Sequence, residues 1–209
     1  MRRVKKRLFV AIGIYIILGV AIGILTGYLR GFPPYGPLAF WMFSDLAGRY
    51  GFWVFSVSLI AYIAKNEKEA GITSFAYMLA MCISYYTYLY MHKGILYKKE
   101  FVFWTFFAVF AAGCAVLIRV AKEKERKRDL AVCVVPLALL GIEFLQMVYF
   151  LYSYGTNVFQ LIIDFIGVVT IGALFQHNRT RKSKAIILGG AGIITAAVCG
   201  FYLILWSVT

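Results

Sequence analysis

Charged residues are scarce in this sequence, and acidic residues are the scarcest. Asp, Glu, Lys and Arg make up 15% of the 209 residues, and only nine are Asp or Glu. Soluble domains carry about 25% charged residues. With a hydrophobic fraction of 62%, the chain has no stretch that could form a fused water-soluble catalytic domain or a disordered tail. The composition predicts a multi-pass membrane protein.

Motifs of known catalytic sites are missing as well. There is no G-x-S-x-G nucleophile elbow, no H-E-x-x-H zinc motif and no glycine-rich phosphate loop. The two histidines, His92 and His177, fall at the ends of apolar segments on opposite sides of the expected membrane, so a Ser-His or Cys-His pair is hard to build. We expect no enzyme, no catalytic residues, no metal and no cofactor. An intramembrane hydrolase that uses two carboxylates is the alternative within this class.

Cysteine is also rare, and its positions exclude a disulfide framework. Cys82, Cys114, Cys133 and Cys199 all lie inside apolar runs, without C-x-x-C spacing and without a nearby histidine. We expect packed free thiols rather than a metal site.

Seven apolar segments fill the chain. Each is bounded by charges or by Gly and Pro, and they cover residues 8–29, 38–64, 72–91, 101–120, 130–152, 157–176 and 185–206. A spanning helix needs about 20 residues, so we expect one all-α integral membrane domain over residues 1–209, with about seven transmembrane helices. The first segment lacks an A-x-A cleavage site, and we read it as an uncleaved span.

The basic residues predict the orientation of this bundle. With the N-terminus in the cytoplasm, 17 of the 22 Lys and Arg residues fall inside and four fall outside. The positive-inside rule therefore places the C-terminus outside. The net charge of +13 is explained by these loops, which contact anionic lipid headgroups, and not by nucleic-acid binding.

Small residues recur every fourth position in the first and last spans. The two stripes are Gly19, Gly23 and Gly27, and Gly192, Ala196 and Gly200. Such stripes let helix backbones approach closely in lipid. We expect packing faces within the chain, with homodimerisation or contact with another membrane protein as the alternative.

The second apolar segment is irregular. Residues 38–64 are more than one span requires, and they include Asp45, Gly48, Arg49 and Gly51. The uninterrupted part, 50–64, rises only about 22 Å, which is too short for a hydrocarbon core of about 30 Å. We expect either one long tilted helix, which we favour, or a helix broken near the two glycines.

Polar residues of the spans fall in one layer, in the outer half of the membrane. Helical rise places Asp45, Arg49, Glu143 and Asp164 about 10–15 Å below the outer boundary. Asn157 and Gln160 lie above Asp164. The complete set of candidate ligand-binding residues is Asp45, Arg49, Tyr85, Tyr86, Tyr88, Glu143, Gln146 and Asp164. Ionisable residues within spans are functional candidates by default.

Two interpretations of this layer stay open. In the first, the charges neutralise one another, and protonated carboxyl groups bind neighbouring tyrosines to hold helices together. In the second, they line an outward-facing polar pocket for a small polar or cationic solute, because two carboxylates beside one arginine leave negative charge and tyrosines suit a cation. We favour the second, a solute-binding or transport protein. A non-transporting assembly or immunity factor is the alternative.

Several motifs resemble known families. L-G-V-A-I-G-I-L-T-G at 18–27, I-S-Y-Y at 83–86 and L-L-G-I-E-F-L-Q at 139–146 resemble a family of small bacterial multi-pass membrane proteins of unknown function, which implies a bacterial cytoplasmic membrane and a compact helix bundle. G-P-L-A-F-W-M-F-S-D-L-A-G at 36–48 is similar to the substrate-binding subunits of energy-coupling-factor vitamin transporters. That likeness implies an outward pocket for a ligand, although Gly19, Gly23 and Gly27 stand where those subunits carry an A-x-x-x-A motif.

Overall fold

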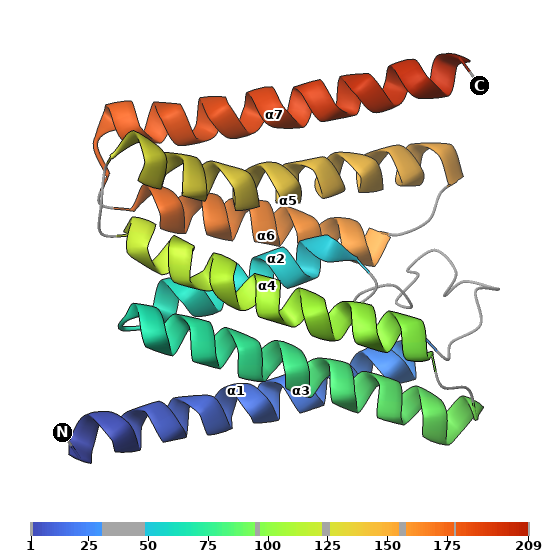
Figure 1. The fold of residues 1–209 in the computed structure, drawn as a ribbon. Coiled ribbons are helices and arrows are strands. Elements are labelled where there is room, and N and C mark those ends of the chain that lie inside the picture. The colour runs from blue at the N-terminus through green and yellow to red at the C-terminus, as the bar shows by residue number, and fades with distance from the viewer. Residues whose placement is uncertain are drawn as a thin grey trace. The chain divides into compact units, whose positions relative to one another are not determined.

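Helices make up the fold. The computed structural model describes residues 2–30, 49–94, 97–122, 126–154, 158–177 and 179–208, and within these ranges it contains no β-strand (Figure 1). The helices are α1 (Arg2–Leu29), α2 (Tyr50–Ile63), α3 (Glu67–Lys93), α4 (Lys98–Lys122), α5 (Lys127–Tyr154), α6 (Val158–Gln176) and α7 (Arg181–Val208). The predicted all-α class is confirmed.

Five of these helices are long and apolar enough to cross a membrane. The qualifying segments are Arg7–Leu29, Lys98–Lys122, Arg128–Ser153, Val158–Gln176 and Arg181–Gly200. The 14 residues of α2 rise only about 21 Å, and α3 has the length but many polar side chains. The chain is thus a multi-pass membrane protein by length and composition.

The ends of α3 show how local sequence defines a helix. Asn66 is the N-cap, and its side-chain oxygen accepts a hydrogen bond of 2.9 Å from the backbone N–H of Glu69. Gly94 ends the helix with a φ of +66°, and its N–H donates to the carbonyl of Tyr90 at 2.9 Å. Glycine adopts this left-handed conformation without steric cost, so the helix stops there.

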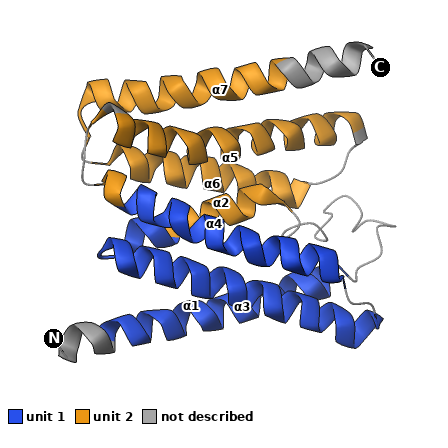
Figure 2. Cartoon of the chain, viewed as in Figure 1, with its two compact units in different colours: residues 1–32, 60–119 blue, residues 33–59, 120–209 orange. Residues whose placement is uncertain are grey.

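The chain divides into two compact units, each assembled from two stretches of sequence (Figure 2). Unit 1 comprises residues 1–32 and 60–119, which hold α1, α3 and most of α4. Unit 2 comprises residues 33–59 and 120–209, which hold most of α2 together with α5, α6 and α7. The chain leaves unit 1, enters unit 2 and returns, so neither unit is a continuous segment.

In unit 1 the glycine stripe of α1 lies directly against α3. A Cβ atom built on Gly19 would meet the Tyr77 carbonyl and would come within 3.2 Å of the Met81 nitrogen. A Cβ on Gly23 would meet the Ser84 hydroxyl. The structure therefore places the first small-residue stripe at a helix contact where only glycine leaves enough room.

In unit 2 the stripe of α7 behaves differently from our expectation. Nothing described lies within 4 Å of a Cβ built on Gly192 or Gly200, and Ala196 is exposed. The contact with α5 uses the neighbouring helix face, where Thr195 donates a hydrogen bond of 3.2 Å to the Ala138 carbonyl and packs against Gly141. The inward face of α7 thus includes Thr195 together with the buried residues Ile187 and Ala191.

The second apolar segment is not one continuous helix through Arg49. Arg49 lies in a bend and α2 begins at Tyr50, which differs from the tilted helix that we favoured. Asp45 and the rest of residues 31–48 lie outside the described ranges, and with them the predicted Asp45–Arg49 pair. An acceptor for the Gly51 amide, described below, stabilises this helix start.

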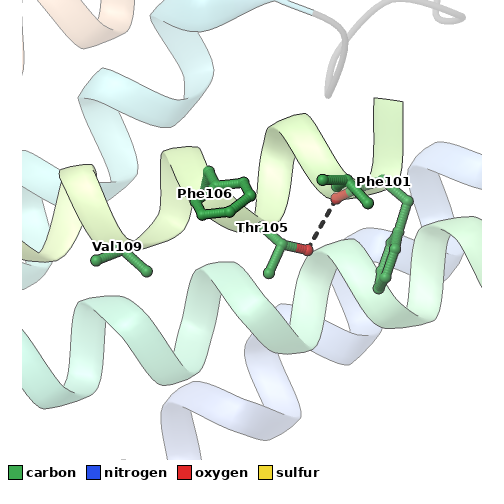
Figure 3. A pocket seen from close by; sticks show the side chains of 5 residues that line it. Phe101, Thr105, Phe106 and Val109 are labelled. Carbon is green, nitrogen blue, oxygen red and sulfur yellow. Dashed lines mark hydrogen bonds between the residues drawn. The ribbon is translucent and has the colours of Figure 1, made fainter. Parts of the chain in front are cut away.

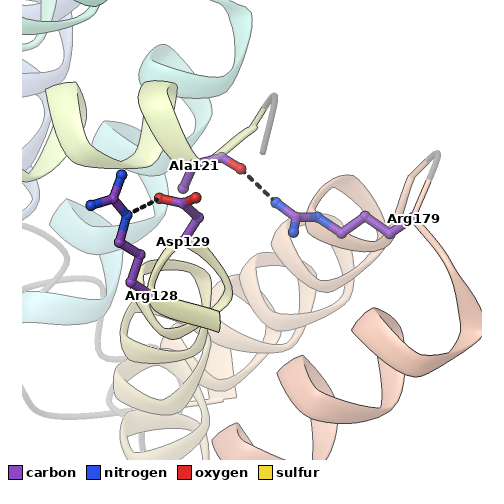
Figure 4. Close-up of polar contacts among 4 residues, drawn as sticks. All are labelled: Ala121, Arg128, Asp129 and Arg179. Atoms are coloured by element: carbon purple, nitrogen blue, oxygen red, sulfur yellow. Dashed lines mark hydrogen bonds and ion pairs between the residues drawn. The ribbon is translucent and has the colours of Figure 1, made fainter. Parts of the chain in front are cut away.

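Two arginines bind the C-terminal ends of helices. Arg119 donates to the Lys65 carbonyl at 2.5 Å, just beyond the end of α2. Arg179 donates to the Ala121 carbonyl at 2.9 Å, in the last turn of α4, while Arg128 approaches Asp129 at 3.7 Å (Figure 4). Guanidinium groups stabilise helix C-termini because the final carbonyls lack donors and carry partial negative charge.

Candidate functional site

Two carboxylates from different helices converge on the start of α2 inside unit 2. Glu143 of α5 and Asp164 of α6 have exposed fractions of 0% and 1%. The Gly51 N–H donates a short hydrogen bond to Glu143 Oε2. The amide of Gln160, one helical turn before Asp164, donates to Asp164 Oδ1 at 2.7 Å. We call Gly51, Glu143, Gln160 and Asp164 the carboxylate cluster.

Gly51 allows both carboxylates to reach the helix backbone. A Cβ at this position would lie 2.7 Å from Glu143 Oε2 and 3.1 Å from Asp164 Oδ1. Both oxygens therefore lie within 3.1 Å of the same point, where any other residue would carry a side chain. The first amides of a helix have no intrahelical acceptor and carry partial positive charge, so a carboxylate here is stabilised.

Arg49 is the cation beside this cluster. Arg49 lies two residues before Gly51, and its guanidinium lies 5.5 Å from the centre of the Phe150 ring on α5, the helix that carries Glu143. Two acidic groups face one arginine, so the cluster keeps excess negative charge when both carboxyl groups are ionised.

The cluster has more acceptor atoms than donors among the described residues. Among the residues that the structure describes, no partner reaches Glu143 Oε1, Gln160 Oε1 or Asp164 Oδ2, although all three atoms are buried. Native proteins leave few buried polar atoms unsatisfied, and each such atom calls for an explanation. All three are acceptors, so a proton, a cation or a ligand that carries N–H or O–H groups would satisfy them.

The tyrosines predicted for the same site lie in unit 1. Tyr85 and Tyr86 are buried and form a packed cluster with Leu89, against which Tyr97, Phe101 and Trp104 lie. Tyr85 accepts a hydrogen bond from Arg30, whose guanidinium also lies 5.6 Å from the centre of the Tyr97 ring. These contacts give both tyrosines a structural role in unit 1.

Two of the remaining predicted residues, Tyr88 and Gln146, lie near these two clusters. Tyr88 stacks on His92 with ring centres 3.9 Å apart and faces Gly27 of α1. Gln146 is half-buried, three residues beyond Glu143. Asp45 lies outside the described ranges.

Two members of the cluster were absent from the predicted ligand set. Gln160 stands four residues before Asp164, a spacing that places both side chains on one helix face. Gly51 was interpreted only as a helix breaker. Its hydrogen bond to Glu143 joins residues 92 positions apart, and no local pattern reports such a contact.

A separate hollow on α4 is apolar and does not resemble a polar binding pocket. Its volume is about 290 Å³, and it is lined by Phe101, Val102, Thr105, Phe106 and Val109 (Figure 3). The Thr105 hydroxyl, which is its polar group, donates to the Phe101 carbonyl at 2.8 Å. Such a surface suits lipid chains.

The chain belongs to a protein family of unknown function. Residues 2–207 match the family described as "Family of unknown function (DUF6518)". No curated protein and no solved structure matches the chain. The predicted resemblance to a family without known activity is confirmed, whereas the bacterial origin and the likeness to vitamin transporters stay predictions.

Proposed function

We propose that this membrane protein binds a small polar or cationic solute at the carboxylate cluster and helps to move it across the membrane. The observation that carries the proposal is the set of three buried acceptor oxygens without donors, on Glu143, Gln160 and Asp164. If the cluster served only to hold helices together, its stabilising effect would be largest when every buried polar atom had a hydrogen-bond partner. Acceptors left open in a layer with excess negative charge favour a ligand that supplies positive charge or donors.

The proposed topology is that of one domain with about seven crossings. The split of 17 basic residues against four supports a cytoplasmic N-terminus and an external C-terminus in a bacterial cytoplasmic membrane. The interleaving of the two units along the chain also supports a single domain. The 14 residues of α2 are too few to cross the hydrocarbon core by themselves.

Access to the cluster requires a conformational change. Glu143 and Asp164 are almost fully buried, so a solute larger than a proton reaches them only after helices of unit 2 separate. Discontinuous helices whose ends lie beside a buried ion are the elements that move or bind in many transporters. The start of α2 at Tyr50 has this arrangement, since its amide at Gly51 faces Glu143.

The decisive experiment is a binding screen on purified protein in detergent. Na⁺, K⁺, ammonium, primary amines and amino acids are tested for saturable stabilisation in a thermal-shift assay, with Glu143→Gln and Asp164→Asn beside the parent. Both changes keep size and remove charge. The exposed Glu100 on α4 provides the matched control, Glu100→Gln. We expect the two cluster variants to fold and lose the stabilisation, and the control to keep it.

The alternative function is that of a non-transporting structural or accessory membrane protein. The bond from Gly51 to Glu143 favours it, because a carboxylate that binds the N-terminus of α2 also holds α2 to α5. In that case no compound stabilises the parent, and Glu143→Gln lowers the yield of folded protein. If both cluster variants fold and retain all solute binding of the parent, the proposed site is wrong.

A further inference from the structure

A groove between α1 and the start of α3 in unit 1 combines charged and apolar walls. Its lining comprises Arg7, Val10, Ala11, Ile14, Lys65 and Glu69, and its volume is about 460 Å³. The groove lies wholly within unit 1 and shares no residue with the carboxylate cluster. Its function therefore does not depend on the function proposed above.

The lining changes from charged to apolar along α1. Arg7 is the first residue of the segment that is long and apolar enough to cross a membrane. If this segment spans the bilayer, Arg7 is at the level of the lipid headgroups. Val10 and Ile14 follow at one-turn intervals, and 56% and 52% of their surfaces are exposed. One end of the groove is thus charged, as headgroups require, and the other is apolar, as acyl chains require.

The charged residues on the α3 side have backbones held by hydrogen bonds. The Lys65 carbonyl accepts from Arg119 at 2.5 Å, and the Glu69 N–H donates to the side chain of Asn66 at 2.9 Å. These bonds fix the backbone positions from which the side chains of Lys65 and Glu69 extend. The lining of the groove combines two cations and one carboxylate.

We propose that this groove binds a phospholipid whose headgroup contains both a phosphate and a protonated primary amine, as in phosphatidylethanolamine. Arg7 and Lys65 bind the phosphate, since cationic side chains make strong hydrogen bonds with phosphate oxygens. Glu69 accepts N–H bonds from the ammonium, and an acyl chain lies along Val10, Ala11 and Ile14. A phosphatidylglycerol headgroup places an uncharged glycerol, rather than an ammonium, beside Glu69, and a choline headgroup has no N–H to donate.

A headgroup series on the unmodified protein tests the proposal. The protein in detergent receives equal amounts of phosphatidylethanolamine, its N,N-dimethyl derivative, phosphatidylcholine or phosphatidylglycerol with identical chains, and native mass spectrometry counts the retained lipid. We expect phosphatidylethanolamine to be retained about threefold more than phosphatidylcholine, as for a partly exposed ion pair. The dimethyl lipid should fall between them. Equal retention of all four lipids, or preferential retention of phosphatidylglycerol, would overturn the proposal.

Substitutions assign the preference to single residues. Glu69→Gln should abolish the advantage of phosphatidylethanolamine over phosphatidylcholine, and Arg7→Gln or Lys65→Gln should weaken retention of every phospholipid. Glu67→Gln and Lys68→Gln are matched controls, because both residues are exposed on the same turn of α3 outside the groove. If Glu69→Gln leaves the headgroup preference unchanged, Glu69 does not bind the ammonium group, and the proposal is contradicted.

Discussion

Gly51 joins three helices through a single missing side chain. The carboxylates of Glu143 and Asp164 occupy the space that a Cβ would need, and the amide of Gly51 binds one of them. In most helix interiors glycine lowers stability by about 1 kcal/mol relative to alanine. Here the cost is offset by a contact that alanine would prevent.

Gly51→Ala should therefore destabilise the protein despite the better helix propensity of alanine. The Cβ would lie 2.7 Å from Glu143 Oε2, and overpacking of this kind costs about 1–3 kcal/mol. The measurement is thermal unfolding in detergent. Gly113→Ala in α4 is the control, because no described atom lies within 4 Å of its Cβ, and it should be neutral or stabilising. Equal melting of both variants would show that the carboxylates are not packed on Gly51.

The Glu143–Asp164 pair should retain at least one proton near neutral pH. Two carboxyl groups that approach one point in a low dielectric resist simultaneous ionisation and titrate as a pair. Infrared difference spectroscopy should detect a protonated carboxyl band at pH 7 that disappears or shifts in Glu143→Gln and Asp164→Asn. Glu100→Gln should leave the band unchanged.

The same pair predicts how any cation binding depends on pH. The bound cation competes with the retained proton, so affinity should rise from pH 5 to pH 8 in the parent. Glu143→Gln and Asp164→Asn should remove this dependence. If the cation affinity of the parent is constant over this pH range, the cation does not bind at the carboxylate cluster.

At the scale of helices, substitutions in the two small-residue stripes should have opposite effects on stability. Gly23 faces the Ser84 hydroxyl across the α1–α3 contact, whereas nothing described surrounds Gly192 on α7. Gly23→Leu should cost at least about 1–3 kcal/mol of stability, and Gly192→Leu should leave the melting of monomeric protein unchanged. Melting curves of the two variants in one detergent test this. If Gly192→Leu disrupts an oligomer without affecting the monomer, the α7 stripe is an intermolecular face.

The arginine contacts at helix ends predict that some basic residues stabilise the fold as well as direct its orientation. Arg179→Gln removes the charged donor from the Ala121 carbonyl, and a hydrogen bond to a charged group contributes about 1.5–3 kcal/mol. Arg181→Gln removes the same charge from an exposed position and should cost little. Denaturant titration in mixed micelles compares the two. Equal losses would show that only the net charge matters.

At the scale of the whole molecule, topology is open to a direct test. In a background without Cys82, Cys114, Cys133 and Cys199, a cysteine at Thr209 should react with an impermeant reagent from outside, and one at Lys182 should not. Lys182 suits this experiment because its side chain is exposed, whereas the adjacent Ser183 is only 5% exposed and a cysteine there would resist labelling from either side. Reaction of both positions from the same side would contradict an odd number of crossings.

The sequence by itself determined the class and the elements of this protein. Apolar runs of about 20 residues between charged loops predict membrane helices, because each backbone polar group in lipid must be satisfied within its own helix. Five of the described helices meet that criterion, and the caps of α3 at Asn66 and Gly94 follow from residues adjacent in sequence. The stripe of Gly19, Gly23 and Gly27 was likewise visible, since a period of four residues defines one face of a helix.

Only the tertiary structure decided which of the polar residues meet. The sequence placed Glu143, Asp164 and the tyrosines at similar depth, but depth does not determine which helices are neighbours. Within unit 1, Tyr85 and Tyr86 pack with Leu89. Within unit 2, Glu143 binds Gly51, because a buried carboxylate must find a donor and the free amide at the start of α2 provides one. The inward face of α7 was likewise visible only in the structure, because α7 has small residues on more than one face and the sequence does not say which of them meets the Ala138 carbonyl through Thr195.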